Sequence, residues 1–97
     1  MLRITSDTAG GEYRIKLEGC LSGPWVAELG ACWIAAAIAH AGRRIRVDLA
    51  DVCHVDRQGR ELMSLMYRAG VRFAAKGFVM TEVVREISAP VDRRRRN

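Results

Sequence analysis

The side chains with the greatest chemical potential lie in one short segment, Cys53-His54-Val55-Asp56. A thiol beside an imidazole can become a nucleophile, because the imidazole takes up the thiol proton. Adjacent residues of an extended segment point to opposite faces, however, so Cys53 and His54 are not expected to meet. We therefore expect Cys53 to be buried as a small apolar residue and His54 to be exposed, with no catalysis by the pair.

Three aspartates around this segment, Asp48, Asp51 and Asp56, raise the question of a cation site. Their spacing does not match a calcium-binding loop, and no glutamate follows at the distance that would close one. Asp56 is better explained as the N-cap of a helix, where its carboxylate would accept backbone N–H groups. The sequence thus predicts no metal site.

The chain contains three cysteines, Cys20, Cys32 and Cys53, without a Cys-x-x-Cys spacing. This pattern gives no disulfide framework and no zinc motif, and each cysteine is expected to be buried. Motifs of zinc proteases, serine hydrolases, P-loop enzymes and dinucleotide-binding enzymes are also missing from the sequence. We therefore expect a protein that is not an enzyme and binds no cofactor.

The N-terminal residues show no cationic start followed by an apolar stretch, so a secretory signal is not predicted. No apolar run approaches the ~20 residues that cross a bilayer. An odd number of cysteines without a framework is consistent with a reducing compartment. The expected location is the cytoplasm, and no membrane span is expected.

The net charge of +5 over 97 residues is concentrated at one end of the chain. The segment from Asp92 to Asn97 carries four arginines and one aspartate, a net charge of +3, which leaves +2 for the rest. An arginine run can bind nucleic acid or an anionic membrane through counterion release, but terminal runs of this kind are usually solvated. Without interleaved aromatic residues the pattern argues against nucleic acid, and residues 90–97 are predicted to be a basic disordered tail.

These residues must be positioned by the elements around them. Alternating apolar and polar residues predict strands over 2–6 and 13–18, and the glycine-containing segment 7–11 between them predicts a β-hairpin. Pro24 suits a first helical position and predicts a helix over 25–41, with Ser22 or Gly23 as N-cap. Trp25 and Trp33 are expected to pack from this helix against the sheet.

The remaining elements are predicted as a strand over 45–49, a loop over 50–56, a helix over 57–69, a strand over 71–75 and a helix over 80–87. A strand that follows a strand and a long helix should run parallel to the first strand. The ββαβαβα order predicts one α/β domain over residues 1–89, a mixed β-sheet with helices packed on it.

The segment from Arg44 to Gly59 resembles the core motif of STAS domains, which include bacterial anti-sigma factor antagonists and the cytoplasmic tails of sulfate transporters. The family pattern is a strand ending in Asp-Leu, an apolar residue three positions on, and an apolar-Asp-x-x-Gly turn that opens a helix. The matching residues are Asp48, Leu49, Val52, Val55, Asp56 and Gly59. Segments 17–21 and 70–73 resemble the neighbouring strands, so the resemblance covers most of residues 2–88 and implies a STAS-like fold.

One departure from the family pattern concerns regulation. Phosphorylated antagonists carry Ser or Thr in the two positions between the motif Asp and Gly, where this chain has Arg57 and Gln58. Neither side chain accepts a phosphoryl group, so the phosphorylation switch is predicted to be missing there. Arg57 also places a positive charge beside the positive end of the helix dipole. The exchange indicates either an altered function or drift in a solvated first turn, and both stay open.

The resemblance implies a non-enzymatic regulatory module that binds a protein partner, an anti-sigma factor or a kinase-like regulator. The predicted contact surface follows the carboxyl ends of two parallel strands, where α/β sheets place their sites. It consists of Asp56, Arg57, Gln58, Gly59 and Arg60 together with Ser22 and Gly23. Two alternatives remain: an accessory subunit of a transport system, or a domain that binds a small ligand or nucleotide at the same loop. A homodimer is also left open.

Overall fold

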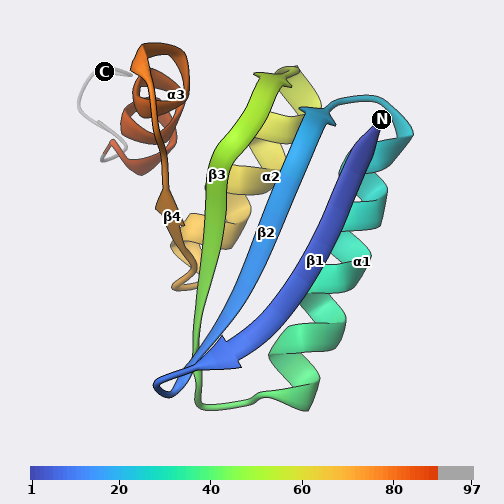
Figure 1. Cartoon of the computed structure of the whole chain (residues 1–97), viewed down its shortest axis with the longest axis vertical. Helices are drawn as coiled ribbons and strands as arrows, with labels where there is room; N and C mark the ends of the chain where they lie inside the picture. The colour runs from blue at the N-terminus through green and yellow to red at the C-terminus, as the bar shows by residue number, and fades with distance from the viewer. Residues whose placement is uncertain (90–97) are drawn as a thin grey trace, which may run out of the picture.

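The computed structural model describes residues 1–89, and the predicted basic tail at 90–97 lies outside the described residues. Its elements follow the predicted ββαβαβα order (Figure 1). They are β1 (Leu2–Ala9), β2 (Glu12–Leu21), α1 (Pro24–Ala39), β3 (Arg44–Val55), α2 (Arg57–Arg68), β4 (Arg72–Ala74) and α3 (Phe78–Ser88). Among residues 1–89, no helix combines the length and the apolar character that crossing a membrane requires.

The four strands form one mixed sheet in the order β1-β2-β3-β4. The first pair is antiparallel and turns through Gly10 and Gly11, which both have positive φ as a tight hairpin turn demands. Because two glycines suffice for the turn, Asp7 and Thr8 pair with β2 and belong to β1. The β2–β3 pair is parallel, which confirms the predicted pairing, and β4 also runs parallel to β3.

The helices α1 and α2 both lie behind the sheet in Figure 1, and α3 lies beyond the β3 side. The core fills the space between the sheet and the helices. Its fully buried large side chains are Ile15, Leu17 and Leu21 of β2, Leu29 of α1, Val47 and Leu49 of β3, and Met63 and Met66 of α2. As expected, Trp25 and Trp33 pack against this core from α1, although both are only partly buried.

The strands β2 and β3 extend further than the sequence predicts. Residues 50–55, predicted as a loop, continue β3 to Val55, and β2 runs past Gly19 to Leu21. The pairing of these strands contains two register shifts, the second between Gly19 and Cys20. Along this irregular stretch Val52 and Val55 are both buried, three positions apart, so the period of two is lost. That loss is why the segment looked like a loop.

Gly19 shows why this end of β2 cannot follow a regular pattern. Its φ is +112°, a conformation that side chains disfavour. A Cβ at this position would also collide with the carbonyl oxygen of Met1. That same oxygen accepts a hydrogen bond from the Cys20 N–H at 2.9 Å. A glycine is therefore required where β1 begins and β2 approaches its end.

Candidate functional site

Asp56 stands between the end of β3 and the start of α2, and its carboxylate joins two loops. One oxygen, Oδ1, accepts the Gly59 N–H at 2.8 Å, which confirms the predicted N-cap. The other, Oδ2, accepts the Gly23 N–H at 3.0 Å, just before α1. These two hydrogen bonds lower the pKa of Asp56, and the one from Gly23 has the larger effect. One ionised side chain thus holds together both parts of the predicted contact surface.

Backbone contacts fix the same two loops at the carboxyl ends of β2 and β3. The Asp56 N–H donates to the Leu21 carbonyl at 3.1 Å, so the end of β2 is tied to the start of α2. A Cβ on Gly59 would lie 2.8 Å from that carbonyl and 2.8 Å from Cγ1 of Val55. Real Cβ atoms do not approach so closely, so a glycine is needed for the first turn of α2 to pack here.

Three of the predicted contact residues, Arg57, Gln58 and Arg60, face solvent around this centre. The side chain of Arg57 is 92% exposed, and its Nε lies 3.6 Å from Glu61 one turn further along α2. Arg60 reaches across to α3, where its Nε lies 3.8 Å from Glu86. Gln58 is also exposed. The structure therefore brings all seven predicted residues to one end of the molecule, with Arg57, Gln58 and Arg60 available as hydrogen-bond donors.

Sequence reasoning missed the acidic neighbours of these arginines. Glu61 offsets the positive charge that Arg57 places at the helix N-terminus, and its i,i+4 spacing was a signal that could have revealed it. Glu86 comes from α3, and no local pattern connects it with Arg60. Both arginines border a surface hollow between α2 and α3, which Ser64 also lines.

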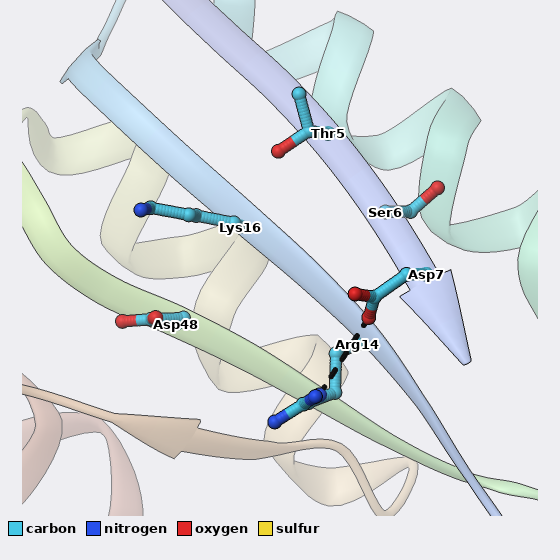
Figure 2. Close-up of a pocket in the computed structure, with 6 residues that line it drawn as sticks. All are labelled: Thr5, Ser6, Asp7, Arg14, Lys16 and Asp48. Atoms are coloured by element: carbon cyan, nitrogen blue, oxygen red, sulfur yellow. Dashed lines mark ion pairs between the residues drawn. The ribbon is translucent and has the colours of Figure 1, made fainter. Parts of the chain in front are cut away.

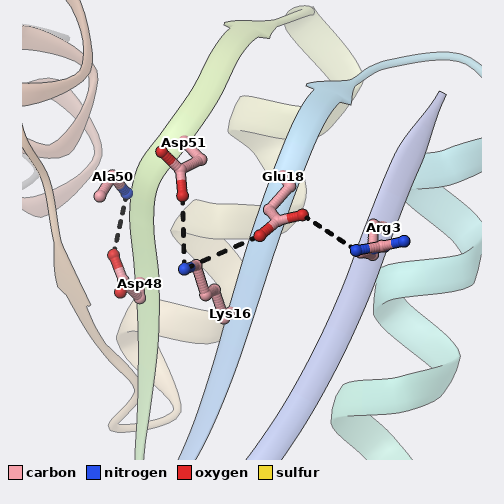
Figure 3. A network of polar contacts seen from close by, with 6 residues as sticks. All are labelled: Arg3, Lys16, Glu18, Asp48, Ala50 and Asp51. Carbon is pink, nitrogen blue, oxygen red and sulfur yellow. Dashed lines mark hydrogen bonds and ion pairs between the residues drawn. The ribbon is translucent and has the colours of Figure 1, made fainter.

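The face of the sheet opposite α1 and α2 carries a network of ion pairs (Figure 3). Lys16 Nζ lies 3.4 Å from Asp51 and 3.7 Å from Glu18. Glu18 in turn lies 3.7 Å from Arg3. The hydrogen bond and charge of Asp51, followed by the charge of Glu18, raise the pKa of Lys16. Lys16 therefore stays protonated and is unsuited to act as a base.

A hollow on the same face lies towards the hairpin (Figure 2). Arg14 Nε and Asp7 Oδ1 form an ion pair 3.6 Å apart at its edge. Its walls also include Thr5 and Ser6, with Lys16 and Asp48 from the neighbouring strands. Charges of both signs are already paired there, and exposed pairs of this kind contribute little to stability.

The three aspartates considered as cation ligands each have another partner. Asp48 Oδ1 accepts the Ala50 N–H at 2.9 Å, Asp51 pairs with Lys16, and Asp56 caps α2. Within residues 1–89, no three His, Cys, Asp or Glu side chains gather in a way that could hold a metal ion.

The expectation that the cysteines are buried is wrong. Cys20 and Cys32 are half-buried, and Cys53 is exposed together with His54. The reason is the irregular end of β3: Val52 and Val55 both point into the core, which leaves the two residues between them outside. Strict alternation, on which the prediction rested, does not hold there. Instead, Cys53 Sγ lies 3.2 Å from Cys20 Sγ on β2.

Comparison with known proteins shows the fold. No protein-family model matches the chain, and no curated protein matches it in sequence. The structure of the anti-sigma factor antagonist SpoIIAA in its unphosphorylated form matches with a TM-score of 0.64 and 21% identity, over 84% of this chain and 80% of that one. An uncharacterized protein of the DUF3478 family with a SpoIIAA-like fold, from Shewanella loihica PV-4, matches with a TM-score of 0.57 and 13% identity, over 88% and 75%.

A third structure, that of Mglu, matches with a TM-score of 0.61 and 19% identity over 77% of this chain. The chain spans only 19% of the length of Mglu. These likenesses confirm the predicted architecture, in which a mixed four-stranded sheet and three helices form a STAS-like fold.

Proposed function

We propose that this chain, with its STAS-like fold, is a non-enzymatic regulatory module of the cytoplasm that acts by binding a protein partner. The contact surface is formed by residues 22–23 and 56–60. The observation that carries the proposal is the Asp56 carboxylate, which accepts the N–H groups of both Gly23 and Gly59. It holds the two loops as one preorganised surface, so a partner can bind without first ordering them.

The exposed side chains of this surface indicate the chemistry of the partner. Arg57, Gln58 and Arg60 offer hydrogen-bond donors, and two of them carry positive charge. An acidic patch with carboxylate or carbonyl acceptors complements such a surface and also raises the association rate. The partner we propose is an anti-sigma factor or a kinase-like regulator, because an anti-sigma factor antagonist shares the fold.

Regulation at this surface would not use phosphorylation. SpoIIAA has a form described as unphosphorylated. In the present chain Arg57 and Gln58, the positions beside the capping Asp56, have no hydroxyl to receive a phosphoryl group. We therefore propose that phosphorylation at the start of α2 does not control partner binding.

Co-expression with the products of neighbouring genes tests the proposal. The tagged chain is expressed with each product, and the dissociation constant of any complex is measured for the wild type and for Arg57→Glu. A loss of at least tenfold is expected, since the reversed charge would face an acidic partner. Arg14→Glu, which makes the same charge change on the open sheet face, serves as the control and should bind as the wild type does. Equal binding by all three proteins would show that the surface is wrong.

The same experiment separates the accessory-subunit alternative, because co-purification with a transporter ATPase would select it. The ligand-binding alternative has one feature in its favour, the hollow that Arg57 and Arg60 border beside the N-terminus of α2. A nucleotide bound there at 100 times its dissociation constant would add ~2.7 kcal/mol to the free energy of unfolding. Thermal unfolding in the presence of a panel of nucleotides detects that shift. If no nucleotide stabilises the chain, the ligand-binding alternative is rejected and binding of a protein partner remains.

A further inference from the structure

Two cysteines that lie 33 positions apart in the sequence come together on the open face of the sheet. Cys20 is near the end of β2 and Cys53 near the end of β3, and their Sγ atoms are 3.2 Å apart. In the β2–β3 pairing, Gly19 lies opposite Val52 and Cys20 lies opposite His54. The register shift between these two pairs leaves Cys53 without a partner residue of its own, next to Cys20. The two strands are direct neighbours in the sheet, as a disulfide between them requires. The two side chains thus already bring their sulfurs together.

The two thiols differ in exposure. Cys53 is exposed, so a small oxidant in solvent reaches its sulfur, whereas Cys20 is half-buried. The hydrogen bond with Cys53 and, second, burial raise the pKa of the Cys20 thiol. The contact between the two sulfurs therefore favours the protonated form of Cys20. Its exposure makes Cys53 the sulfur that attacks first, and Cys20 the one that resolves the product.

We propose that Cys20 and Cys53 form a redox-active dithiol that hydrogen peroxide oxidises to an intrachain disulfide between β2 and β3. In the first step the Cys53 thiolate attacks a peroxide oxygen, the O–O bond breaks, and a sulfenic acid forms while hydroxide leaves and is protonated to water. In the second step the Cys20 sulfur attacks the sulfenic sulfur, the S–S bond forms, the S–O bond breaks, and the oxygen leaves with the Cys20 proton as a second water. The two thiols lose two electrons in total, and peroxide gains them.

The position of this pair links it to the contact surface. Cys20 lies two residues before Ser22, and Cys53 lies three residues before Asp56. A disulfide would fix the distance between the ends of the two strands from which both loops emerge. The redox chemistry itself rests on the contact between the two sulfurs and on their exposure, and it does not depend on the proposed function.

Mass spectrometry of the full chain tests the proposal. The reduced protein is treated with hydrogen peroxide, and its intact mass should fall by about 2 Da, the two hydrogens lost in one disulfide. Cys20 and Cys32 share the tryptic peptide 17–43, whereas Cys53 lies in 47–57. The Cys32→Ser variant therefore identifies the bond: peptides 17–43 and 47–57 should be found cross-linked, at a rate independent of protein concentration.

The single variants check the order of the two steps. In Cys20→Ser no intrachain disulfide should form, and a sulfenic acid at Cys53 should be trapped by a dimedone probe. In Cys53→Ser the rate of peroxide consumption should fall at least tenfold. The proposal is overturned if the wild type keeps three free thiols under peroxide, if the bond involves Cys32, or if only disulfides between chains appear.

Discussion

At the scale of single residues, Asp56 has the largest structural role in the candidate site. Its carboxylate accepts one N–H from each of two loops. Among residues 1–89, no other side chain of the proposed surface forms a bridge between these loops. Asp56→Ala should lower the midpoint temperature of unfolding by roughly 4–8 °C, because it removes an N-cap and a second bond. Asp7→Ala, which removes an exposed carboxylate on the hairpin, is the control and should change the midpoint by much less. Thermal unfolding followed by circular dichroism measures both.

The ionisation of Asp56 predicts a pH dependence of stability. Its pKa is lowered in the folded state by the N–H groups of Gly23 and then Gly59. The stability that the carboxylate contributes is therefore fully present above its ordinary pKa of 3.8 and is lost as the pH falls through the lower folded value. Urea unfolding from pH 6 down to pH 2 should show a smaller acid loss in Asp56→Asn than in the wild type. Parallel curves for the two proteins would contradict the assigned role.

Individual residues also show what the sequence could reveal. The capping role of Asp56 was predictable, because N-capping depends on residues within one helical turn. Its bond to Gly23 was not, because that residue is 33 positions away and only the fold brings it near. The same limit applies to Cys20 and Cys53, whose contact arises from a register shift that no local pattern signals.

At the scale of elements, the packing of α2 against β2 depends on Gly59. A Cβ there would meet the Leu21 carbonyl and Val55 at 2.8 Å, so Gly59→Ala should destabilise the fold by about 1–3 kcal/mol despite the better helix propensity of alanine. Gly30→Ala in α1 is a matched control, because its Cβ would lie 3.8 Å from Leu62, an ordinary contact. That variant should be neutral or more stable by up to about 1 kcal/mol. Urea unfolding of the two variants measures the difference.

The helix α1 contains apolar side chains on both its inner and its outer side. Leu29 is fully buried against the core, whereas Ile38 is 76% exposed. Leu29→Ala should lower the free energy of unfolding by about 2–5 kcal/mol, since it opens a cavity. Ile38→Ala should change it by no more than about 0.5 kcal/mol. Denaturant midpoints compare the two, and similar losses would mean that the outer side of α1 is covered in solution.

Element order was predictable, but the lengths of the elements were not. Alternating apolar and polar residues identified β2 and located the turn before it. Pro24, at the first position of the helix, identified α1. The ends of β2 and β3 were missed because Val52 and Val55 are buried three positions apart. Gly19, which resembles a strand terminator in sequence, is instead the residue that lets β2 pass close to Met1.

At the scale of the whole molecule, most of the net charge lies in a different part of the sequence from the residues of the candidate site. Removal of residues 92–97 takes away a net charge of +3 and leaves +2. Any affinity of the full chain for DNA or anionic vesicles should therefore disappear in the truncated chain, while partner binding at the Asp56 surface is retained. A salt series on both proteins checks this. Retained DNA affinity after truncation would assign the binding to the folded region instead.

A partner is proposed to dock on the surface formed by residues 22–23 and 56–60. The most direct measurement is a titration of the isotope-labelled chain with its partner, followed through the backbone amide signals. The signals of Gly23, Gly59 and Arg60 should shift or broaden most, while those of Arg14 and Lys16 on the open sheet face stay in place. If the largest changes fall on the open sheet face or on the outer side of α1, the proposed surface is wrong.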